Sequence, residues 1–284
     1  MENKINSENK TNSGNKINSE NKINAENKIN AGNKTNSEVK ELLEKLTDCM
    51  KECGKLILNA DRGSALIDEK AGHANFVTTY DKMVQVKLQE SFAKIMPEAV
   101  FVGEEEDIHA SIEKGYAFIV DPIDGTTNFI KDYHTSAISV GLLKDGEQFF
   151  GAVYNPYLDE LFTAVKGCGA FLNGKPIHVS NQPLSNGVVL FGTAPYYEEL
   201  NRASFDMAYD YFKKALDIRR SGSAALDLCS VAAGRAELFF ELKLSPWDYA
   251  AGSLIITEAG GIVTTVEGEP LTFDKPCSVL ARNM

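Results

Sequence analysis

The stretch Asp121-Pro-Ile-Asp-Gly-Thr-Thr-Asn-Phe129 decides how the rest of the chain is interpreted. It follows a short apolar run at residues 116–120, which predicts a buried strand because turn residues bound it. We therefore expect Asp121 at the carboxyl end of a strand, where open α/β sheets place their ligands. The proline and the glycine on either side of Asp124 predict a tight turn that holds the two carboxylates close together.

Two carboxylates this close repel each other unless a cation lies between them. Mg²⁺ is the natural occupant, because it binds carboxylate, carbonyl and water oxygens rather than sulfur or imidazole. The alternative is an ordinary surface turn, since Asp-Pro and Asp-Gly are common turn dipeptides. The central stretch therefore predicts either a metal site or a surface loop.

Two further acidic stretches favour the metal site. Val102-Gly-Glu-Glu-Glu-Asp107 follows another short apolar run, although an isolated run of acids is usually a solvated loop. Pro246-Trp-Asp-Tyr-Ala-Ala-Gly252 opens a helical pattern over residues 249–259, in which Asp248 is alternatively only the helix N-cap. All three stretches place acids where a predicted strand ends or a predicted helix begins. Together they would supply the oxygen ligands of a two- or three-metal phosphate site.

The three motifs, in this order, resemble the inositol monophosphatase family of Mg²⁺-dependent, lithium-sensitive phosphatases. The wider superfamily adds fructose bisphosphatases and nucleotide 3'-phosphatases. The resemblance covers the chain from about Val39 onwards. It implies an α/β (α+β) fold, a layered αβαβα sandwich of the sugar-phosphatase type. Its N-terminal α+β half would contain a largely antiparallel sheet, its C-terminal half would be α/β, and the protein would be a homodimer.

The resemblance also implies the metal ligands. Glu104, Asp121 and the carbonyl of Ile123 would hold a first Mg²⁺, which lowers the pKa of a bound water to make the nucleophile. Asp121, Asp124 and Asp248 would hold a second Mg²⁺, which neutralises charge on the leaving alkoxide, so that no covalent phosphoenzyme is needed. Asp124 and Asp248 would also border the substrate.

Three further side chains receive roles from the resemblance. Thr126 would orient the attacking water through its hydroxyl, and Glu104 would accept the proton of that water. Asp81, in a Val-Thr-x-x-Asp setting, would orient the waters of a weaker third metal, although an Asp before a helix is most often its cap. Lys70, eleven residues earlier, would border the same site, although a Lys in a polar loop is most often solvated.

The expected substrate contacts lie in both halves. Glu241 is seven residues before Asp248, where inositol-specific members carry an acid that receives the sugar hydroxyls. The alternative for Glu241 is a solvated residue at a strand edge. Gly222, Ser223 and Ala224 match the family's stretch of backbone contacts to the same ring. The backbone N–H groups of Gly125 and Thr126 would meet phosphate oxygens at the start of a helix, where the dipole favours anions.

The chain divides into three parts. Residues 1–37 are dominated by six copies of the hexapeptide Asn-Lys-Ile/Thr-Asn-Ser/Ala-Glu/Gly, a polar composition typical of a disordered tail. Residues 38–175 would form an N-terminal α+β metal-binding domain, because their later part reads as an antiparallel meander. Residues 176–284 alternate strand and helix and would form a C-terminal α/β domain that completes the active site between the halves.

Composition limits the class of function. The chain has 284 residues and a net charge of −11, and the basic repeats make the remainder still more acidic. An acidic body argues against binding to a nucleic-acid backbone, but not against a phosphate substrate if metals carry the positive charge. No run approaches membrane-spanning length, and the five cysteines show no paired spacing. We therefore expect a cytoplasmic protein with no membrane partner.

These patterns predict an enzyme that hydrolyses small phosphate esters. The expected reaction is Mg²⁺-dependent hydrolysis of myo-inositol monophosphate to inositol and phosphate. One alternative is a fructose-1,6-bisphosphatase or another sugar or polyol phosphatase of the same superfamily. A non-enzymatic alternative is a cation-binding regulatory or RNA-associated protein that keeps the fold.

Overall fold

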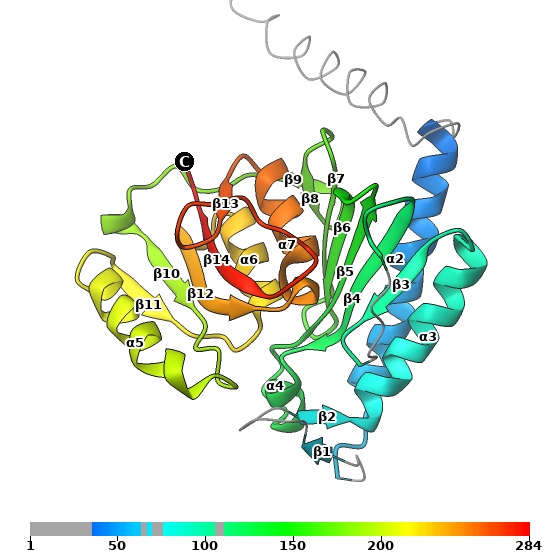
Figure 1. Ribbon diagram of the computed structural model, residues 1–284, viewed down its shortest axis with the longest axis horizontal. Coiled ribbons are helices and arrows are strands. Elements are labelled where there is room, and N and C mark those ends of the chain that lie inside the picture. Colours follow the sequence, from blue (N-terminus) through cyan, green and yellow to red (C-terminus); the bar gives the residue numbers. More distant parts are fainter. Residues whose placement is uncertain (1–35, 64–66, 70–75, 106–110) are drawn as a thin grey trace, which may run out of the picture.

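The computed structural model describes residues 36–63, 67–69, 76–105 and 111–284. The predicted tail therefore lies almost entirely outside the described residues, and Lys70 lies outside them too. The described part forms layers in the order helices, sheet, helices, sheet, helix (Figure 1). This arrangement confirms the predicted αβαβα sandwich. The domain boundary between residues 175 and 176 stays a prediction.

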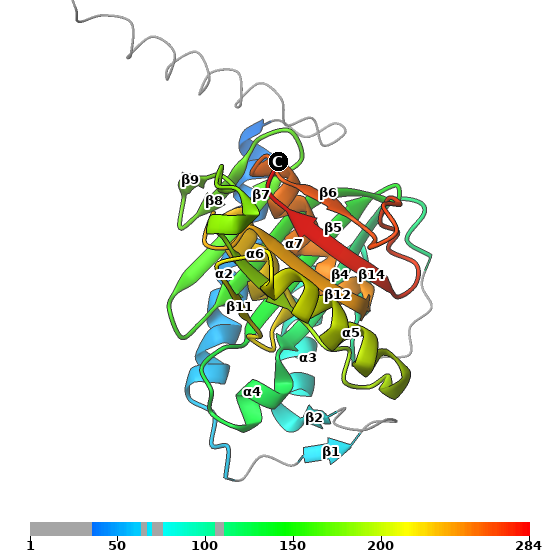
Figure 2. The same cartoon turned by 90° about the vertical axis from the view of Figure 1, so that its left-hand side faces the viewer.

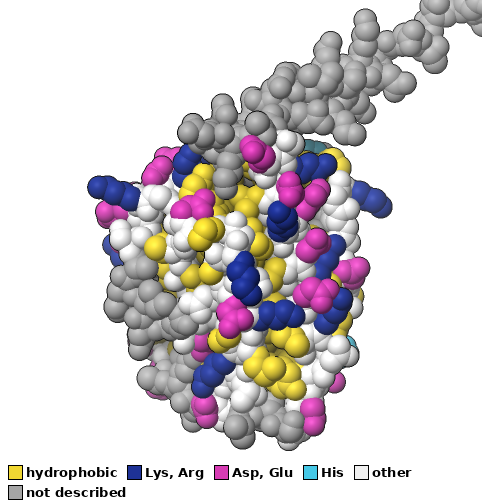
Figure 3. Space-filling model, turned by 90° about the vertical axis from the view of Figure 1, so that its right-hand side faces the viewer, with side chains coloured by type: hydrophobic (Ala, Val, Ile, Leu, Met, Phe, Trp, Pro, Cys, Tyr) yellow, Lys and Arg dark blue, Asp and Glu magenta, His cyan; other side chains and the backbone are white. Residues whose placement is uncertain are grey.

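The first layer consists of α2 (Asn36–Leu58) and α3 (Thr79–Ile95), which pack against each other and against one face of the first sheet. Apolar side chains at helical spacing, among them Leu46, Met50 and Leu88, are fully buried there. Acidic and basic side chains are interspersed over the outer surface on this side of the molecule (Figure 3). The spacing of apolar residues thus decides which helix faces meet the sheet.

The first sheet has seven strands and is antiparallel except for its first pair. Its strands follow the chain in spatial order: β3 (Val100–Gly103), β4 (Tyr116–Asp124), β5 (Ala137–Lys144), β6 (Glu147–Asn155), β7 (Glu160–Val165), β8 (Ala170–Leu172) and β9 (Lys175–Ile177). A separate pair, β1 (Ile67–Glu69) and β2 (Phe76–Thr78), precedes α3. The largely antiparallel first half is therefore confirmed.

The second sheet has five strands in the order β11-β10-β12-β14-β13, with parallel pairs at one side and antiparallel pairs at the other. Its strands are β10 (Val188–Phe191), β11 (Asp217–Arg219), β12 (Leu238–Leu244), β13 (Ile262–Thr264) and β14 (Cys277–Arg282). A 3₁₀ turn (Leu184–Asn186) precedes β10, and α5 (Glu198–Phe212) covers the outer face (Figure 2).

The middle layer joins the two sheets. It consists of α6 (Ala224–Ala232) and α7 (Pro246–Glu258), which contact each other, and α7 lies on β4 to β7 of the first sheet. Glycines in β5 and β6 allow this close approach, because a Cβ on Gly151 would lie 2.7 Å from the Ala251 carbonyl oxygen. The start of α7 is thereby fixed beside the end of β4. No helix of the described residues is long and apolar enough to cross a membrane.

Candidate active site

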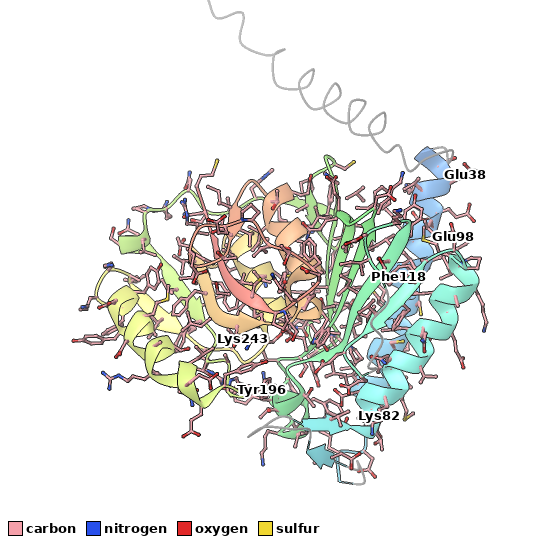
Figure 4. The ribbon with its side chains drawn as sticks, in the orientation of Figure 1. Glu38, Lys82, Glu98, Phe118, Tyr196 and Lys243 are labelled. Carbon is pink, nitrogen blue, oxygen red and sulfur yellow. The ribbon has the colours of Figure 1, made fainter. Side chains whose placement is uncertain are left out.

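A cavity of about 440 Å³ lies where the two halves meet. Its lining residues come from the end of β4, the short helix α4 (Thr126–Ile130), the segments after β10 and β11, strand β12 and the start of α7. Figure 4 labels two of the lining residues of the C-terminal half, Tyr196 and Lys243, at the inner edge that faces the N-terminal half. A volume of this size suits a small-molecule substrate.

Three predicted metal ligands meet in this cavity. Asp121, Asp124 and Asp248 each offer a carboxylate oxygen, and these oxygens lie within 4.8 Å of one another. Oxygen donors at such separations suit a hard divalent cation. The residues present therefore fit Mg²⁺, and the Glu104 carboxylate and the Ile123 residue line the same cavity.

The strand predicted over residues 116–120 is longer in the structure, and Asp121 lies within its C-terminal part. Strand β4 continues to Asp124, and its pairing with β5 shifts register between Asp121 and Asp124. Residues three apart on a regular strand point to opposite faces, whereas one extra residue in a bulge returns them to the same face. The bulge therefore explains how one strand brings both carboxylates to one cavity.

Asp248 is part of a helix cap as well as part of the acid cluster. Ser245 is the N-cap of α7, and the Ser245 backbone N–H donates to Asp248 Oδ2 over 2.7 Å, which completes a capping box. The prediction that α7 starts at residue 249 with Asp248 as its N-cap was therefore wrong by one turn. Capping and metal binding are compatible, because the cap occupies one carboxylate oxygen.

Asp81 occupies the same position in α3. Thr78 is the N-cap, its backbone N–H donates to Asp81 Oδ2 over 2.8 Å, and its hydroxyl contacts the same oxygen. The other oxygen, Oδ1, lies 3.1 Å from the Thr126 hydroxyl, which is also 3.2 Å from the Ile123 carbonyl oxygen. Asp81 thus connects α3 to Thr126 of the central motif. This position beside the site is the one that the sequence predicted for Asp81.

Asp124 is held by the N-terminus of α6. The Ser223 hydroxyl and the Ala225 N–H donate to Asp124 Oδ2, the latter over 2.9 Å, and the Ala224 N–H lies 3.3 Å from Oδ1. Ser223 and Ala224 were predicted to contact the substrate through their backbone, as was Gly222. In the structure, all three line the cavity, and the first two also fix the Asp124 carboxylate.

Gln85 supports the loop that carries Glu104. The Glu105 backbone N–H donates to Gln85 Oε1 over 3.0 Å, and a Cβ on Gly103 would lie 2.3 Å from that same oxygen. Sequence reasoning missed Gln85. The available signal was a polar residue at helical spacing between Asp81 and Leu88 in the buried stripe of α3.

Burial, with a smaller contribution from neighbouring charges, raises the pKa of four carboxyl groups: Asp81, Asp121, Asp124 and Asp248. Burial raises the pKa of Asp81 and of Asp124 to about 6 in each case, although hydrogen bonds from Thr78 and Ser223 oppose it. Burial also raises the pKa of Asp121 and of Asp248 well above the usual range, and the charge of Glu104 adds to both shifts. A divalent cation among these acids would remove that repulsion.

Glu241 is buried in β12, which excludes the alternative of a solvated strand-edge residue. Its Oε1 accepts the Ala194 N–H over 2.7 Å, and a Cβ on Gly192 would lie 1.9 Å from its Oε2. Burial raises its pKa to about 7, while the charge of Arg220 acts in the opposite direction. Glu241 therefore lines the cavity as a fixed acceptor.

The structure brings the predicted site residues together, apart from Lys70, which lies outside the described residues. Gly125 is the N-cap of α4 with φ of 87°, but α4 has five residues, so its dipole is small. Asn128, from the same motif, was missed. Its amide donates to the Thr135 carbonyl over 2.7 Å and to the Ser221 carbonyl over 3.0 Å, which connects the two halves at the cavity.

A comparison with known families identifies the chain. The model of the inositol monophosphatase family matches residues 10–283. This chain belongs to the inositol monophosphatase family. It is therefore a phosphatase of this superfamily, whose members depend on Mg²⁺, and its buried acids are a site that can bind the metal. The resemblance inferred from the three acidic motifs is confirmed.

Similar members of the family carry different names. The Inositol-1-monophosphatase of Bacillus subtilis is 35% identical over 87% of this chain and 92% of that protein. The Nus factor SuhB of Salmonella typhimurium is 36% identical over 77% of this chain and 82% of that protein. The Fructose-1,6-bisphosphatase/inositol-1-monophosphatase of Aquifex aeolicus is 39% identical over 71% of this chain and 76% of that protein.

A solved structure supports the same assignment. The crystal structure of the extragenic suppressor protein suhB from Bartonella henselae superposes with a TM-score of 0.80 at 33% identity. The match covers 86% of this inositol monophosphatase family member and 94% of that chain. The names show that the family fold does not by itself fix the substrate.

The acid cluster predicts an unusual pH dependence of stability. The pKa of Asp124 is about 6 in the folded protein against 3.8 for the ordinary group, so its ionisation penalises the folded state as pH rises from about 4 to 6. In EDTA, Asp124→Asn should match the wild type near pH 4 and exceed its free energy of unfolding by about 2–3 kcal/mol at pH 8. Urea unfolding at both pH values measures this difference.

Mg²⁺ provides the matched control for that comparison. It should stabilise the wild type at pH 8 and stabilise Asp124→Asn much less, because the variant lacks one ligand. Identical pH dependence of the two proteins in EDTA would show that burial of the charged Asp124 carboxylate does not limit the stability of the metal-free protein.

Proposed function

We propose that this protein is an Mg²⁺-dependent phosphomonoesterase that hydrolyses myo-inositol monophosphate to inositol and phosphate. The observation that carries the proposal is the placement of Glu241, a buried carboxyl group, in the same cavity as Asp121, Asp124 and Asp248. The cluster suits the phosphate end of such a substrate and Glu241 suits the polyol end.

The acids divide between the proposed metals as follows. Glu104, Asp121 and the Ile123 carbonyl would hold one Mg²⁺, and Asp121, Asp124 and Asp248 would hold another. Bound there, the ions would lower the pKa of a coordinated water and neutralise charge on the phosphate and the leaving oxygen. A third, weaker ion beside Asp81 remains part of the proposal.

The protein's own groups then align the attacking water. The Thr126 hydroxyl has two acceptors, Asp81 Oδ1 at 3.1 Å and the Ile123 carbonyl oxygen at 3.2 Å. It can donate to either, which leaves oxygen lone pairs to accept a hydrogen from water. Glu104, on its Gln85-supported loop, would accept the proton that the water loses. The N–H groups of Gly125 and Thr126 would face the phosphate.

Glu241 would select the alcohol. Its Oε1 is occupied by the Ala194 N–H, and its Oε2 lies against Gly192, where a larger residue would collide with it. A fixed buried acceptor of this kind favours a substrate whose hydroxyls reach it, because an alcohol without them leaves the carboxylate unpaired. A polyol such as inositol meets this requirement. The backbone of residues 222–224 would contact the same ring.

Two other functions have support. A sugar bisphosphatase is favoured by the name of the Aquifex aeolicus relative, Fructose-1,6-bisphosphatase/inositol-1-monophosphatase. A regulatory role is favoured by the name of the Salmonella typhimurium relative, a Nus factor. A phosphatase needs turnover of its substrate, whereas a purely regulatory protein does not. A variant that has lost turnover should therefore still perform a purely regulatory role.

The proposal is tested by phosphate release. With Mg²⁺, the wild type should hydrolyse inositol 1-phosphate, and millimolar lithium should inhibit it. Asp124→Asn should lose at least about 100-fold in kcat, because it removes charge that positions the metal. Release from fructose 1,6-bisphosphate alone would replace inositol by a sugar bisphosphate as the substrate. No release from either ester by the folded protein would favour the regulatory role.

Glu241→Gln tests the selection of the alcohol. We expect kcat/KM for inositol 1-phosphate to fall about 10-fold to 100-fold, the usual effect of losing a charged hydrogen-bond partner. Hydrolysis of 4-nitrophenyl phosphate, which has no alcohol hydroxyls, should change little. Initial rates with both esters measure this difference.

Glu237→Gln is the matched control. Glu237 is also buried, its Oε2 accepts the Val188 N–H over 2.6 Å and it lies against Gly187, but it does not line the cavity. The control should leave the ratio of the two kcat/KM values unchanged. Equal losses on both esters in Glu241→Gln would remove the proposed role of Glu241.

A further inference from the structure

Arg62 is a partly buried cation that the proposed reaction leaves without a role. It follows α2 in the chain, and its side chain is 20% exposed. Its Nε–H donates to the Phe129 carbonyl over 3.0 Å, and its guanidinium lies 5.0 Å from the centre of the Phe129 ring. Phe129 is the last residue of the central motif and lies in α4. Arg62 therefore connects the end of α2 to the helix that carries Thr126.

The two terminal nitrogens of Arg62 bind two further groups. Nη2 donates to the Tyr157 hydroxyl over 3.1 Å, and Nη1 pairs with Asp132 Oδ1 over 3.2 Å. Asp132 follows the C-cap of α4 and has φ of 53°, the left-handed conformation in which helices commonly end. One planar guanidinium thus fixes the end of α4, the turn after it and the Tyr157 side chain.

The helix α4 depends on such contacts. It has five residues, far fewer than a helix needs to be stable alone, so its position must be fixed by the groups around it. Its last carbonyl groups have no partner within the helix, and a cation near them is also favoured by the helix dipole. In Figures 1 and 2, α4 lies beside β2, at the lower edge of the molecule. Arg62 supplies both a donor and a cation at this helix end.

The residue before Arg62 contacts the other segment beside the site. The Asp61 N–H donates to the Tyr80 hydroxyl over 2.9 Å, and the Tyr80 ring centre is 5.6 Å from that of the ring on which Arg62 lies. Tyr80 directly precedes Asp81, whose Oδ1 lies 3.1 Å from the Thr126 hydroxyl. Residues 61 and 62 therefore contact both of the helices that this hydrogen bond joins.

We propose that Arg62 is a positioning residue of the phosphatase, which fixes α4 so that the Thr126 hydroxyl stays aligned with Asp81 and with the attacking water. This inference rests on the proposed function, in which Thr126 orients that water. It does not depend on the alcohol part of the substrate, because Arg62 lies outside the cavity lining. The alternative is an arginine that only stabilises the folded state. A folded variant of Arg62 would then keep the wild-type kcat.

Arg62→Met tests the proposal, because it removes the guanidinium and keeps an unbranched stem. The assay measures hydrolysis of 4-nitrophenyl phosphate, an ester without a polyol, at saturating Mg²⁺. We expect kcat to fall about 10-fold to 100-fold, since a small displacement of a catalytic group can cost this much. Urea unfolding checks that the variant is folded at the assay temperature. An unchanged kcat in the folded variant would overturn the proposal.

A double-mutant cycle separates positioning from general stabilisation. Thr126→Val removes the hydroxyl that Arg62 is proposed to position. If Arg62 acts through that hydroxyl, adding Arg62→Met to Thr126→Val should lower kcat by less than about a further twofold. Losses that multiply in the double variant would show that Arg62 acts by another route, and they would overturn the proposal.

Tyr157→Phe is a milder variant of the same contacts. It removes only the acceptor of Nη2 and should lower kcat about twofold to tenfold, the usual effect of losing one hydrogen bond. If Arg62→Met does not fold, Tyr157→Phe takes its place in the cycle, and an unchanged kcat in Tyr157→Phe then overturns the proposal.

Arg235→Met is the matched control. Arg235 also pairs with a carboxylate, that of Glu160, and its guanidinium lies 5.7 Å from the centre of the Phe162 ring. Both partners belong to β7 rather than to α4. This variant should therefore keep the wild-type kcat. A loss equal to that of Arg62→Met would show that the effect is not specific to α4, which contradicts the proposal.

Amide hydrogen exchange provides a readout that needs no turnover. In EDTA, the backbone of residues 126–132 should exchange at least about fivefold faster in Arg62→Met than in the wild type, whereas α7 should exchange at the same rate in both. Equal exchange of residues 126–132 would overturn the positioning role. Absence of turnover by the wild type with every ester, together with faster exchange in the variant, would instead overturn the proposed function and leave the contact between Arg62 and α4 in place.

Discussion

The structure is organised around buried carboxylates that meet between its two sheets, where burial first and mutual repulsion second disfavour their charged forms. Each of these acids is held by neighbouring groups at one or more of its oxygens: Asp81 by Thr78, Asp121 by the Ile123 N–H, Asp124 by the start of α6 and Asp248 by Ser245. These hydrogen bonds fix the positions of the acids, but they are too few to offset burial, so the pKa values stay raised. The arrangement suits a protein that works with divalent cations bound.

Holding these acids together requires α7 to pack closely on its neighbours at positions outside the acid cluster. Gly141 and Gly151 let α7 approach the first sheet, and Gly252 lies on the side of α7 that meets Leu228 of α6. A side chain at Gly141 or Gly151 would push α7, and Asp248 with it, away from the sheet that carries Asp121, and a side chain at Gly252 would disturb the packing of α7 on α6. The Asn128 amide adds a second connection between the halves. Stability and function are therefore linked through the position of one helix.

Sequence predicted those parts of the site that local patterns encode. The central motif with Asp121 and Asp124, and the capping-type setting of Asp248, are short-range signals, and the layered fold followed from their resemblance to a family. The bulge in β4, the support of the Glu104 loop by Gln85 and the pairing of Ser223 with Asp124 depend on contacts between distant segments. Arg62 was equally hidden, because only the fold shows that its side chain contacts Phe129 of the central motif.

The most direct test of the account is to locate a bound metal by anomalous diffraction from crystals soaked in Mn²⁺, which accepts the same oxygen ligands as Mg²⁺. The account predicts a strong peak among Asp121, Asp124 and Asp248, and loss of that peak in Asp124→Asn. A strong Mn²⁺ peak elsewhere, with none at these acids in a folded protein, would contradict it.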